Sequence, residues 1–479
     1  MNAFRFLLVA ALCTLGAAAQ AAERPNFVFI YTDDQRWDAL GVVQREQGER
    51  ARFPWFSTPN LDKLAAEGVR FRNAFVVNSL CAPSRSVYLT GRYSHHNGVA
   101  NNHTPFPAEN TATTWSNLLR QAGYATGYVG KFHHGQMPGK RPGFDYSASF
   151  IGQGRYTDCP FEVNGVNTPT TGWVDDVSTD FAIDFIKKSK EKPFAVVVGF
   201  KAAHGPFDPP PRLTDKYAGK EARPVPNQGL PPPYAGKFTA GKVKTATPEP
   251  KKKKAQAKAK ANGRTMLQGY FGCLAAVDEN VGRILTTLDE QKLAPNTVVI
   301  FASDNGFYLG EHNLGDKRSA YDESLRIPLL VRAPMLGEAA RGKLVDRIAL
   351  NLDLAPTLLD LAGAAIPGTM QGRSWRPLLT GDPARAEWRS AFFYEYFFER
   401  NFNIPTVLAV RTDKAKLIKY PGHDDWTELF DLAADPYETK NLVNDPASKE
   451  LLAAMQSEFD KQAKAVEFRI PPFADAVPD

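Results

Sequence analysis

After its first 20 residues, the 479-residue chain contains no long run of apolar residues. A helix needs about 18 such residues to cross a bilayer, so we expect no membrane span in the remainder. Hydrophobic residues make up 43% of the chain and charged residues 23%, a balance that excludes wholesale disorder, collagen and coiled coil. At about 150 residues per domain, the length predicts two or three domains, or one large domain with an appendage.

Acidic residues are absent from residues 251–260, and this local absence produces most of the positive net charge. The formal charge is +6, but six lysines fall in that segment and Arg5 lies near the N-terminus. Removing these seven positive charges takes the total from +6 to −1. A lysine-rich segment of this kind is more often a solvated loop than a site for an anionic polymer. We therefore expect no nucleic-acid partner.

Residues 1–22 have the design of a secretory signal peptide. One arginine precedes an apolar core from Phe6 to Leu15, and small residues follow, with an A-x-A pattern at Ala19-Gln20-Ala21. The apolar core is too short to anchor the chain in a membrane. We expect cleavage of this segment and export of the protein, either to the periplasm or to the medium.

Cysteine is scarce, with four residues in the whole chain. Cleavage of the signal peptide removes Cys13 and leaves Cys81, Cys159 and Cys273. One disulfide between Cys159 and Cys273 is possible, and the sequence leaves it open. The odd thiol at Cys81, in a protein predicted to be exported, needs another explanation.

Between residues 25 and about 375, short β-branched or aromatic runs alternate with helical stretches, which predicts an α/β fold with a mostly parallel sheet. The predicted strands are Asn26–Tyr31, Ala125–Val129, Phe194–Phe200, Thr297–Ala302 and Pro328–Val331. Apolar spacing of about 3.6 residues predicts helices. They are Pro59–Glu67, Thr114–Gln121, Val177–Lys188, Leu267–Glu290 and Leu354–Leu361.

Two regions depart from this alternation. Residues 205–250 contain 11 of the 36 prolines and so cannot be regular structure. Together with the lysine-rich segment they form a predicted surface excursion at 205–262, inside a main domain at 23–377. Residues 378–479 predict a smaller C-terminal subdomain with an antiparallel sheet and a terminal helix. Its predicted elements are strands Ala391–Tyr396, Thr406–Arg411, Ala415–Tyr420 and Thr427–Asp431, and a helix from Ser448 to about Lys464.

Polar side chains follow four of the predicted strands directly. Carboxyl ends of parallel strands meet at one edge of a sheet, where such folds bind ligands, so we expect these side chains in one cleft. In chain order they are Asp33 and Asp34, then Lys131, His133 and His134, then Lys201 and His204, and finally Asp304 and Asn305. Each short motif alone is more often a turn or a helix cap than a functional site.

The oxygen-rich part of this set predicts a metal site. Carboxylates are costly to bury together without a cation. Because Asp33, Asp34, Asp304 and Asn305 offer only oxygen ligands and show no Cys/His spacing, they favour a hard ion. Calcium is the first choice, magnesium is the second, and zinc is disfavoured.

The segment at residues 78–92 combines a thiol with an anion-binding pattern. Pro83 suits the first turn of a helix, whose N-terminus then presents free backbone N–H groups beside Cys81. Such an end attracts anions and lowers the pKa of a thiol. Arg85, one turn later, can direct two hydrogen bonds to an oxyanion. The alternative is a buried structural cysteine with an arginine on the helix surface.

The same segment, C-A-P-S-R-S-V-Y-L-T-G from residue 81, resembles the type I sulfatase signature C-x-P-S-R-x-x-x-L-T-G. Further motifs extend the resemblance over most of the chain. They are P-N-F-V-F-I-Y-T-D-D-Q from residue 25, G-Y-V-G-K-F-H-H from 127, K-A-A-H-G-P from 201, A-S-D-N-G from 302, G-E-H-N-L-G-D-K-R from 310, and K-L-I-K-Y-P with E-L-F-D-L-A-A-D-P-Y-E-T-K-N-L near the end.

This resemblance implies an alkaline-phosphatase-like α/β fold, a catalytic domain at 23–377 and a sulfuric ester hydrolase. It implies that a maturation enzyme oxidises Cys81 to formylglycine (3-oxoalanine), which explains the odd thiol. The implied calcium ligands are Asp33, Asp34, Asp304, Asn305 and the modified Cys81. The residues implied to bind sulfate or transfer protons are Arg85, Lys131, His133, His204 and Lys317, with His204 as the candidate acid for the leaving oxygen. His134 and His312 receive no role.

The substrate is expected to be a sulfated glycan or its oligosaccharides. The run from Phe150 to Tyr156 and the segment that contains Trp173 are loosely similar to N-acetylglucosamine-6-sulfatase-like enzymes, although each aromatic is more often packing than a sugar platform. Two alternatives stay open. One is a phosphate or phosphonate monoester hydrolase of the same superfamily, and the other is a glycan-binding protein with a dead site.

Overall fold

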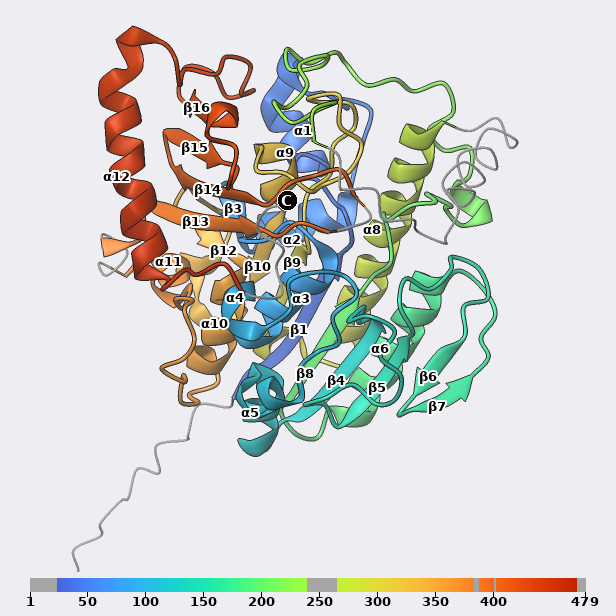
Figure 1. Ribbon diagram of the computed structural model, residues 1–479. Helices are drawn as coiled ribbons and strands as arrows, with labels where there is room; N and C mark the ends of the chain where they lie inside the picture. Colours follow the sequence, from blue (N-terminus) through green and yellow to red (C-terminus); the bar gives the residue numbers. More distant parts are fainter. Residues whose placement is uncertain (1–23, 239–264, 383–386, 400–401, 472–479) are drawn as a thin grey trace, which may run out of the picture.

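The computed structural model describes residues 24–238, 265–382, 387–399 and 402–471 (Figure 1). The predicted signal peptide and residues 239–262 of the predicted excursion lie outside these ranges. Within them, ten strands form one sheet. Their order is β11 (Lys343–Val345), β2 (Val69–Phe71), β10 (Leu329–Arg332), β9 (Thr297–Ser303), β1 (Asn26–Thr32), β8 (Phe194–Gly199), β4 (Ala125–Lys131), β5 (Tyr146–Phe150), β6 (Phe161–Val163) and β7 (Val166–Thr168).

The centre of this sheet is parallel and its flanks are mixed. β1 pairs in parallel with β8 and β9, and β4 pairs in parallel with β8 and β5. β10 runs antiparallel to β9, and β6 runs antiparallel to β5. The mostly parallel sheet predicted from the sequence is therefore confirmed, and the antiparallel pairs lie toward its edges.

Both faces of the sheet are buried, which explains why its strands are apolar throughout. In β1, Val28 and Ile30 join one core cluster, whereas Phe27, Phe29 and Tyr31 join the other. Successive side chains of a strand point to opposite faces, so a strand between two helical layers is apolar at every position.

Helices cover the two faces. The first face packs against α1 (Gly41–Gln47), α2 (Pro59–Glu67), α6 (Val174–Ser189) and α8 (Met266–Glu290). The second face packs against α3 (Cys81–Thr90), α5 (Trp115–Gln121), α10 (Leu354–Leu361) and α11 (Arg376–Thr380). The short helices α4 (Ser94–Asn97) and α9 (Asp322–Leu325) and the two-stranded sheet of β3 (Ala74–Phe75) and β12 (Ala349–Leu350) lie between these layers and the C-terminal part of the chain.

A second, antiparallel sheet follows, as predicted. It has the order β13 (Ala391–Tyr396), β14 (Val407–Thr412), β15 (Ala415–Lys419) and β16 (Glu428–Asp431). The terminal helix α12 (Lys449–Ala465) lies beside this sheet (Figure 1). Its Met455 and Phe459 are buried in the same core cluster as the sheet. The predicted helix bounds hold closely, except that α6 begins three residues before the predicted Val177.

The described part of the predicted excursion, residues 205–238, is irregular apart from a short turn at Pro211–Leu213. It is nevertheless anchored. Tyr217 packs 5.1 Å from the ring of Trp55, and Tyr234 packs 5.6 Å from the ring of Tyr420 in the C-terminal part. The segment thus contacts both parts of the molecule.

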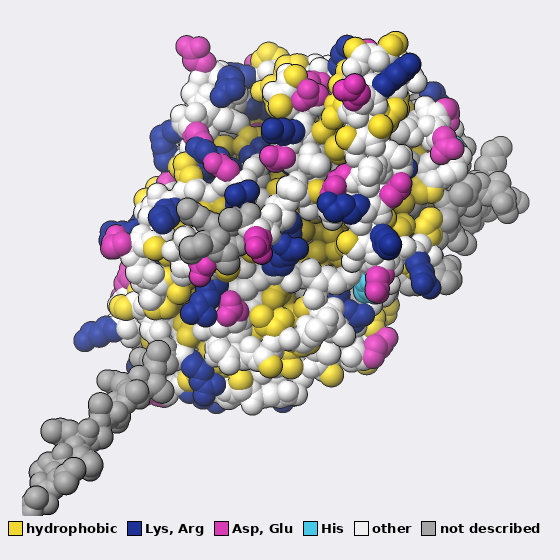
Figure 2. Space-filling view, turned by 90° about the vertical axis from the view of Figure 1, so that its left-hand side faces the viewer, with side chains coloured by type: hydrophobic (Ala, Val, Ile, Leu, Met, Phe, Trp, Pro, Cys, Tyr) yellow, Lys and Arg dark blue, Asp and Glu magenta, His cyan; other side chains and the backbone are white. Residues whose placement is uncertain are grey.

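Three further expectations concern the whole chain. No disulfide joins Cys159 to Cys273 in the described part of the chain. None of the described helices has the length and apolarity needed to span a membrane. On the face shown in Figure 2, basic and acidic side chains are interspersed, in keeping with the near-neutral charge calculated outside the lysine-rich segment.

Candidate active site

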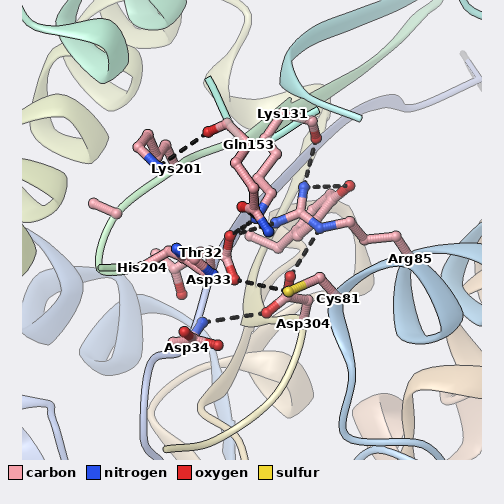
Figure 3. Close-up of polar contacts among 12 residues, drawn as sticks. Thr32, Asp33, Asp34, Cys81, Arg85, Lys131, Gln153, Lys201, His204 and Asp304 are labelled. Atoms are coloured by element: carbon pink, nitrogen blue, oxygen red, sulfur yellow. Dashed lines mark hydrogen bonds and ion pairs between the residues drawn. The ribbon is translucent and has the colours of Figure 1, made fainter. Parts of the chain in front are cut away.

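The candidate site lies at the carboxyl edge of the central strands, and the strand register explains how it forms. Thr32 of β1 pairs with Ser303 of β9, so the next residues, Asp33 and Asp304, emerge side by side. Lys131 ends β4, which is separated from β1 by β8 alone. Cys81 is the first residue of α3 and faces the same point (Figure 3).

The three carboxylates converge closely. One oxygen from each of Asp33, Asp34 and Asp304 lies within 4.8 Å of the others, and all three side chains are buried. Asp34 has a φ of 65°, a left-handed conformation that costs energy for a residue with a side chain. Its backbone N–H donates to Asp304 Oδ1 at 3.2 Å, which holds the two acidic segments together.

Asn305 completes this oxygen cluster. Its Nδ2 donates to Asp34 Oδ1 at 2.7 Å and to the Gly306 carbonyl at 2.8 Å. Its Oδ1 is buried and has no hydrogen-bond partner among the described residues. An orphaned buried acceptor beside three carboxylates is what an oxygen-coordinated cation would satisfy, so these residues fit the predicted calcium site.

The charges of the three acids are only partly balanced. Burial raises the pKa of Asp34 to about 7, with Asp33 and Asp304 adding to the effect and Lys317 opposing it. Burial would also raise the pKa of Asp33, but Lys131 and other cations hold it well below its usual value. The pKa of Asp304 is raised, again by burial and by Asp33.

Cys81 is fully buried, with its Sγ 3.4 Å from Asp33 Oδ1. Asp33, Cys81 and His204 also place one ligand atom each within 4.8 Å of one another. Burial, together with Asp33, raises the pKa of the Cys81 thiol to about 12. The expectation that the helix N-terminus lowers this pKa is therefore wrong, because depth and a neighbouring carboxylate outweigh the helix end.

Arg85 lies one turn after Cys81 and is buried completely. Its Nε donates to Asp304 Oδ2 at 2.8 Å, and its Nη1 donates to the Lys131 carbonyl at 2.5 Å. Its Nη2 lies 3.8 Å from Asp33 Oδ2 and has no hydrogen-bond partner among the described residues. One guanidinium nitrogen is thus available to an incoming anion.

Two lysines contact different acids of the cluster. Lys131 Nζ forms a short ion pair with Asp33, and it donates to Gln153 Oε1 at 2.6 Å. Lys317 Nζ donates to Asp34 Oδ1 at 2.5 Å. Burial opposes the charge of Lys317, but Asp34 reverses this effect and raises its pKa well above the usual value.

The four histidines of the motifs separate into two groups. His133 and His204 belong to the site: the His133 Nδ1 is buried and unpartnered among the described residues, and the His204 Nδ1 lies 2.9 Å from the Gly205 carbonyl. Burial lowers the pKa of both well below the usual value. His134 instead contacts Ser86 Oγ at 2.8 Å, and His312 contacts Asn227 at 3.1 Å and stacks on Tyr321.

Sequence reasoning missed two residues that contact the site. Gln153 accepts a hydrogen bond from Lys131, and a glycine stands on each side of it, a signal that could have drawn attention to it. Asp175 accepts hydrogen bonds from the backbone N–H groups of Lys201 and Ala202, just before His204. Asp175 follows Trp173 in a segment that is loosely similar to glycan sulfatases, but this likeness gives Asp175 no role, and acids are common in a first helical turn.

Comparison with known proteins agrees with this geometry. Residues 25–364 match the sequence model of the Sulfatase family, and residues 310–465 match that of the N-sulphoglucosamine sulphohydrolase C-terminal region. The chain is 32% identical to an N-acetylglucosamine-6-O-sulfatase of Bacteroides thetaiotaomicron, over 97% of this chain and 92% of that protein. This chain belongs to the sulfatase family.

Further relatives of this sulfatase support the assignment. An arylsulfatase of Clostridium perfringens is 28% identical over 89% of this chain and 92% of its own length. A solved structure described as a complex with its substrate D-glucosamine-2-N,6-O-disulfate is 30% identical, has a TM-score of 0.80, and covers 94% of this chain and 99% of its own. The enzyme class and the alkaline-phosphatase-like α/β fold predicted from the sequence are thus confirmed.

Proposed function

We propose that this sulfatase removes sulfate esters from a sulfated glycan or its oligosaccharides, and that it uses a formylglycine made from Cys81 and a bound calcium ion. The single observation that carries the proposal is the convergence of Asp33, Asp34 and Asp304 beside Cys81 and Arg85. A reactive group, a cation site and an anion-binding guanidinium then share one small volume.

The calcium ligands would be Asp33, Asp34, Asp304, Asn305 and the modified side chain of residue 81. The donor set supports a hard cation, since carboxylate and amide oxygens are what calcium prefers, with magnesium as the alternative. The unpartnered Oδ1 of Asn305 supports its place in the set. When bound, the cation would lower the cost of burying these carboxylates together and polarise an oxygen on residue 81.

Formylglycine at position 81 would supply the nucleophile for sulfate-ester cleavage, with the substrate alcohol as the leaving group, and would allow the sulfate to be released without attack by water on sulfur. A maturation enzyme of the host would have to produce this residue. The remaining steps belong to unmodified side chains. Arg85, Lys131 and Lys317 are assigned to the sulfuryl oxygens, where fixed positive groups stabilise developing charge.

Proton transfer is assigned to the two histidines of the site. His204 would protonate the leaving oxygen with help from Lys317, and His133 would serve the formylglycine side. The His204 Nδ1 donates to the Gly205 carbonyl, which leaves Nε2 as the ring nitrogen that can exchange a proton with substrate. It would act as the acid in the protonated, imidazolium form.

The substrate class is inferred from the relatives. A relative named N-acetylglucosamine-6-O-sulfatase and a neighbour solved with a disulfated glucosamine both cover nearly all of this chain. A sulfated hexosamine is therefore the first candidate, in a periplasmic or secreted enzyme as the predicted signal peptide implies. The division into a catalytic part at 23–377 and a C-terminal subdomain at 378–479 is part of this proposal.

The substrate experiment compares sulfate and phosphate esters of one phenol and then a panel of defined sulfated saccharides. We expect turnover of the sulfate ester to exceed that of the phosphate ester, and we expect desulfation of at least one sulfated hexosamine. Faster turnover of the phosphate ester would instead favour the phosphate or phosphonate hydrolase alternative.

Maturation is tested on the protein purified from its own host. Mass spectrometry of the tryptic peptide at 73–85 should show an aldehyde in place of the Cys81 thiol. A peptide with only the unmodified thiol, in a protein without sulfatase activity, would support the alternative of a dead glycan-binding site.

A further inference from the structure

Gln153 is held by two buried lysines of the active site. Lys131 Nζ donates to its side-chain Oε1 at 2.6 Å, and Lys201 Nζ donates to its backbone carbonyl at 3.0 Å. Both lysines are at most 1% exposed. In Figure 3, Gln153 lies between them, above the cluster of Asp33 and Cys81.

The loop that carries Gln153 has a constrained shape. Gly152 and Gly154 flank it with φ values of 57° and 59°, which L side chains rarely adopt. A Cβ on Gly152 would lie 2.6 Å from Gln136 Nε2, and one on Gly154 would lie 2.5 Å from the ring of Phe150. The backbone after β5 therefore presents the side chain of Gln153 in a defined direction.

The contact with Lys131 also determines which way the amide faces. An ammonium group has three donors and no acceptor, so the atom that contacts Lys131 Nζ must be the amide oxygen. The amide nitrogen then points away from Lys131. Both contacts of Gln153 use oxygen atoms, and the side chain is half-buried at the site rather than enclosed. Its Nε2 is a neutral donor next to a fixed cation.

We propose that Gln153 Nε2 donates a hydrogen bond to an oxygen of the sulfate group of the substrate, beside Lys131. The inference rests on the proposed function and adds a substrate-binding residue to the proposed set. A sulfuryl group offers only acceptors, so a donor and an ammonium group on one side of it are complementary to it. Gln153 has a second role, since its Oε1 keeps Lys131 in place.

Two substitutions separate these roles. Gln153→Glu keeps an acceptor for Lys131 but replaces the donor with an anionic oxygen that faces the sulfate. Gln153→Met removes both the acceptor and the donor at similar length. If Nε2 binds sulfate, both variants should raise KM for a sulfate ester and the inhibition constant of inorganic sulfate about tenfold or more, with the glutamate variant the more affected.

The matched control is Gln121→Glu, the same change at an exposed position of α5, which should leave both constants unchanged. If Gln153→Glu keeps the wild-type KM and inhibition constant, Gln153 Nε2 does not bind the sulfate, whatever Gln153→Met does. Gln153 would then at most position Lys131. Thermal unfolding of each variant checks that it folds. Wild-type enzyme without activity on any sulfate ester would refute the proposed function itself, which distinguishes the two failures.

Discussion

Each buried acid in the site contacts a basic side chain, although this pairing only partly offsets the cost of burying the three acids together. The acids Asp33, Asp34 and Asp304 face three cations, Arg85, Lys131 and Lys317, all of them buried. Buried charges are stable only when they are paired, so each lysine contacts a carboxylate here. The proposed calcium ion would compete with the two ammonium groups for the oxygens of Asp33 and Asp34.

Replacement of Cys81 by alanine should separate chemistry from metal binding. We expect Cys81→Ala to abolish turnover, since it removes the only precursor of the nucleophile. The calcium-dependent rise in Tm should mostly remain, because the carboxylates stay in place. Cys159→Ala, at another buried cysteine, is the matched control and should keep its activity. Residual turnover in Cys81→Ala would contradict the assigned nucleophile.

Metal removal should destabilise the protein through the same oxygens. Ligand at about 100 times its Kd stabilises the folded state by about 2.7 kcal/mol, so we expect a chelator to lower the Tm by several degrees. The shift should shrink strongly in Asp34→Asn and persist in Asp346→Asn, whose side chain is 68% exposed. Equal shifts in both variants would place the cation elsewhere. Differential scanning fluorimetry with added calcium measures the effect.

Secondary-structure elements contribute by fixing the backbone of the site. Asp175 in the first turn of α6 accepts from Lys201 N at 2.8 Å and from Ala202 N at 2.9 Å, with a different oxygen for each. The same segment is hydrogen-bonded to Asp33: the Asp33 N–H donates to the Ala202 carbonyl at 2.9 Å, and the Ala203 N–H donates to the Asp33 carbonyl at 2.6 Å. One helix thus holds the end of β8 against the end of β1.

Asp175→Asn should therefore be more harmful than an isosteric change suggests. An amide has one acceptor oxygen, so one backbone N–H loses its partner and faces an NH₂ group instead. We expect a loss of about 1–3 kcal/mol in the free energy of unfolding and a lower kcat, from displacement of Asp33 and His204. Asp176→Asn, which weakens a surface ion pair with Arg212, is the control. Urea unfolding and steady-state kinetics measure both effects, and equal behaviour of the two variants would contradict this role.

At the scale of the whole molecule, the C-terminal sheet is joined to the catalytic part through buried polar contacts. Glu428 of β16 accepts hydrogen bonds from Tyr321 and Tyr420 at 2.8 and 2.7 Å. Lys416 of β15 binds Asp322 and Glu438, each at 2.7 Å. Tyr321 and Asp322 follow Lys317 closely in the chain, so the C-terminal sheet holds the segment next to that lysine.

This interface should make stability depend on pH. Burial raises the pKa of Glu428 to about 7, with the hydroxyls of Tyr420 and Tyr321 opposing the shift, Glu438 adding to it and Lys416 opposing it. An acid whose pKa is raised by folding stabilises the protein below its unfolded pKa, and this stability is lost as pH rises through 7. The folded state should therefore weaken between about pH 5 and pH 8.

Glu428→Gln should remove part of this dependence. Glutamine can accept from one tyrosine and donate to the other, and it carries no charge to bury. We expect the variant to match the wild type near pH 5 and to exceed it by about 1–3 kcal/mol near pH 8. Unfolding curves at the two pH values measure this difference. Glu450→Gln on exposed α12 should change neither value, and a steeper pH dependence in Glu428→Gln would contradict the explanation.

The strands, the helices and most of the candidate site could be predicted from the sequence because they depend on local patterns. Apolar runs specify strands that are buried on both faces, and polar residues at their ends must then meet at one edge. The register of Thr32 with Ser303 brings Asp33 to Asp304 as that rule predicts. The motif around Cys81 was specific enough to predict the enzyme class.

The remaining features depend on tertiary packing, because distant parts of the chain set how deeply a side chain is buried and where a loop places its residues. The pKa of Cys81 is raised rather than lowered, since its helix begins in the interior next to Asp33. Cys159 and Cys273 form no disulfide, although composition allowed one. Gln153 and Asp175 contact the site only because a loop and a helix from separate segments converge there, and no local pattern records where such segments meet.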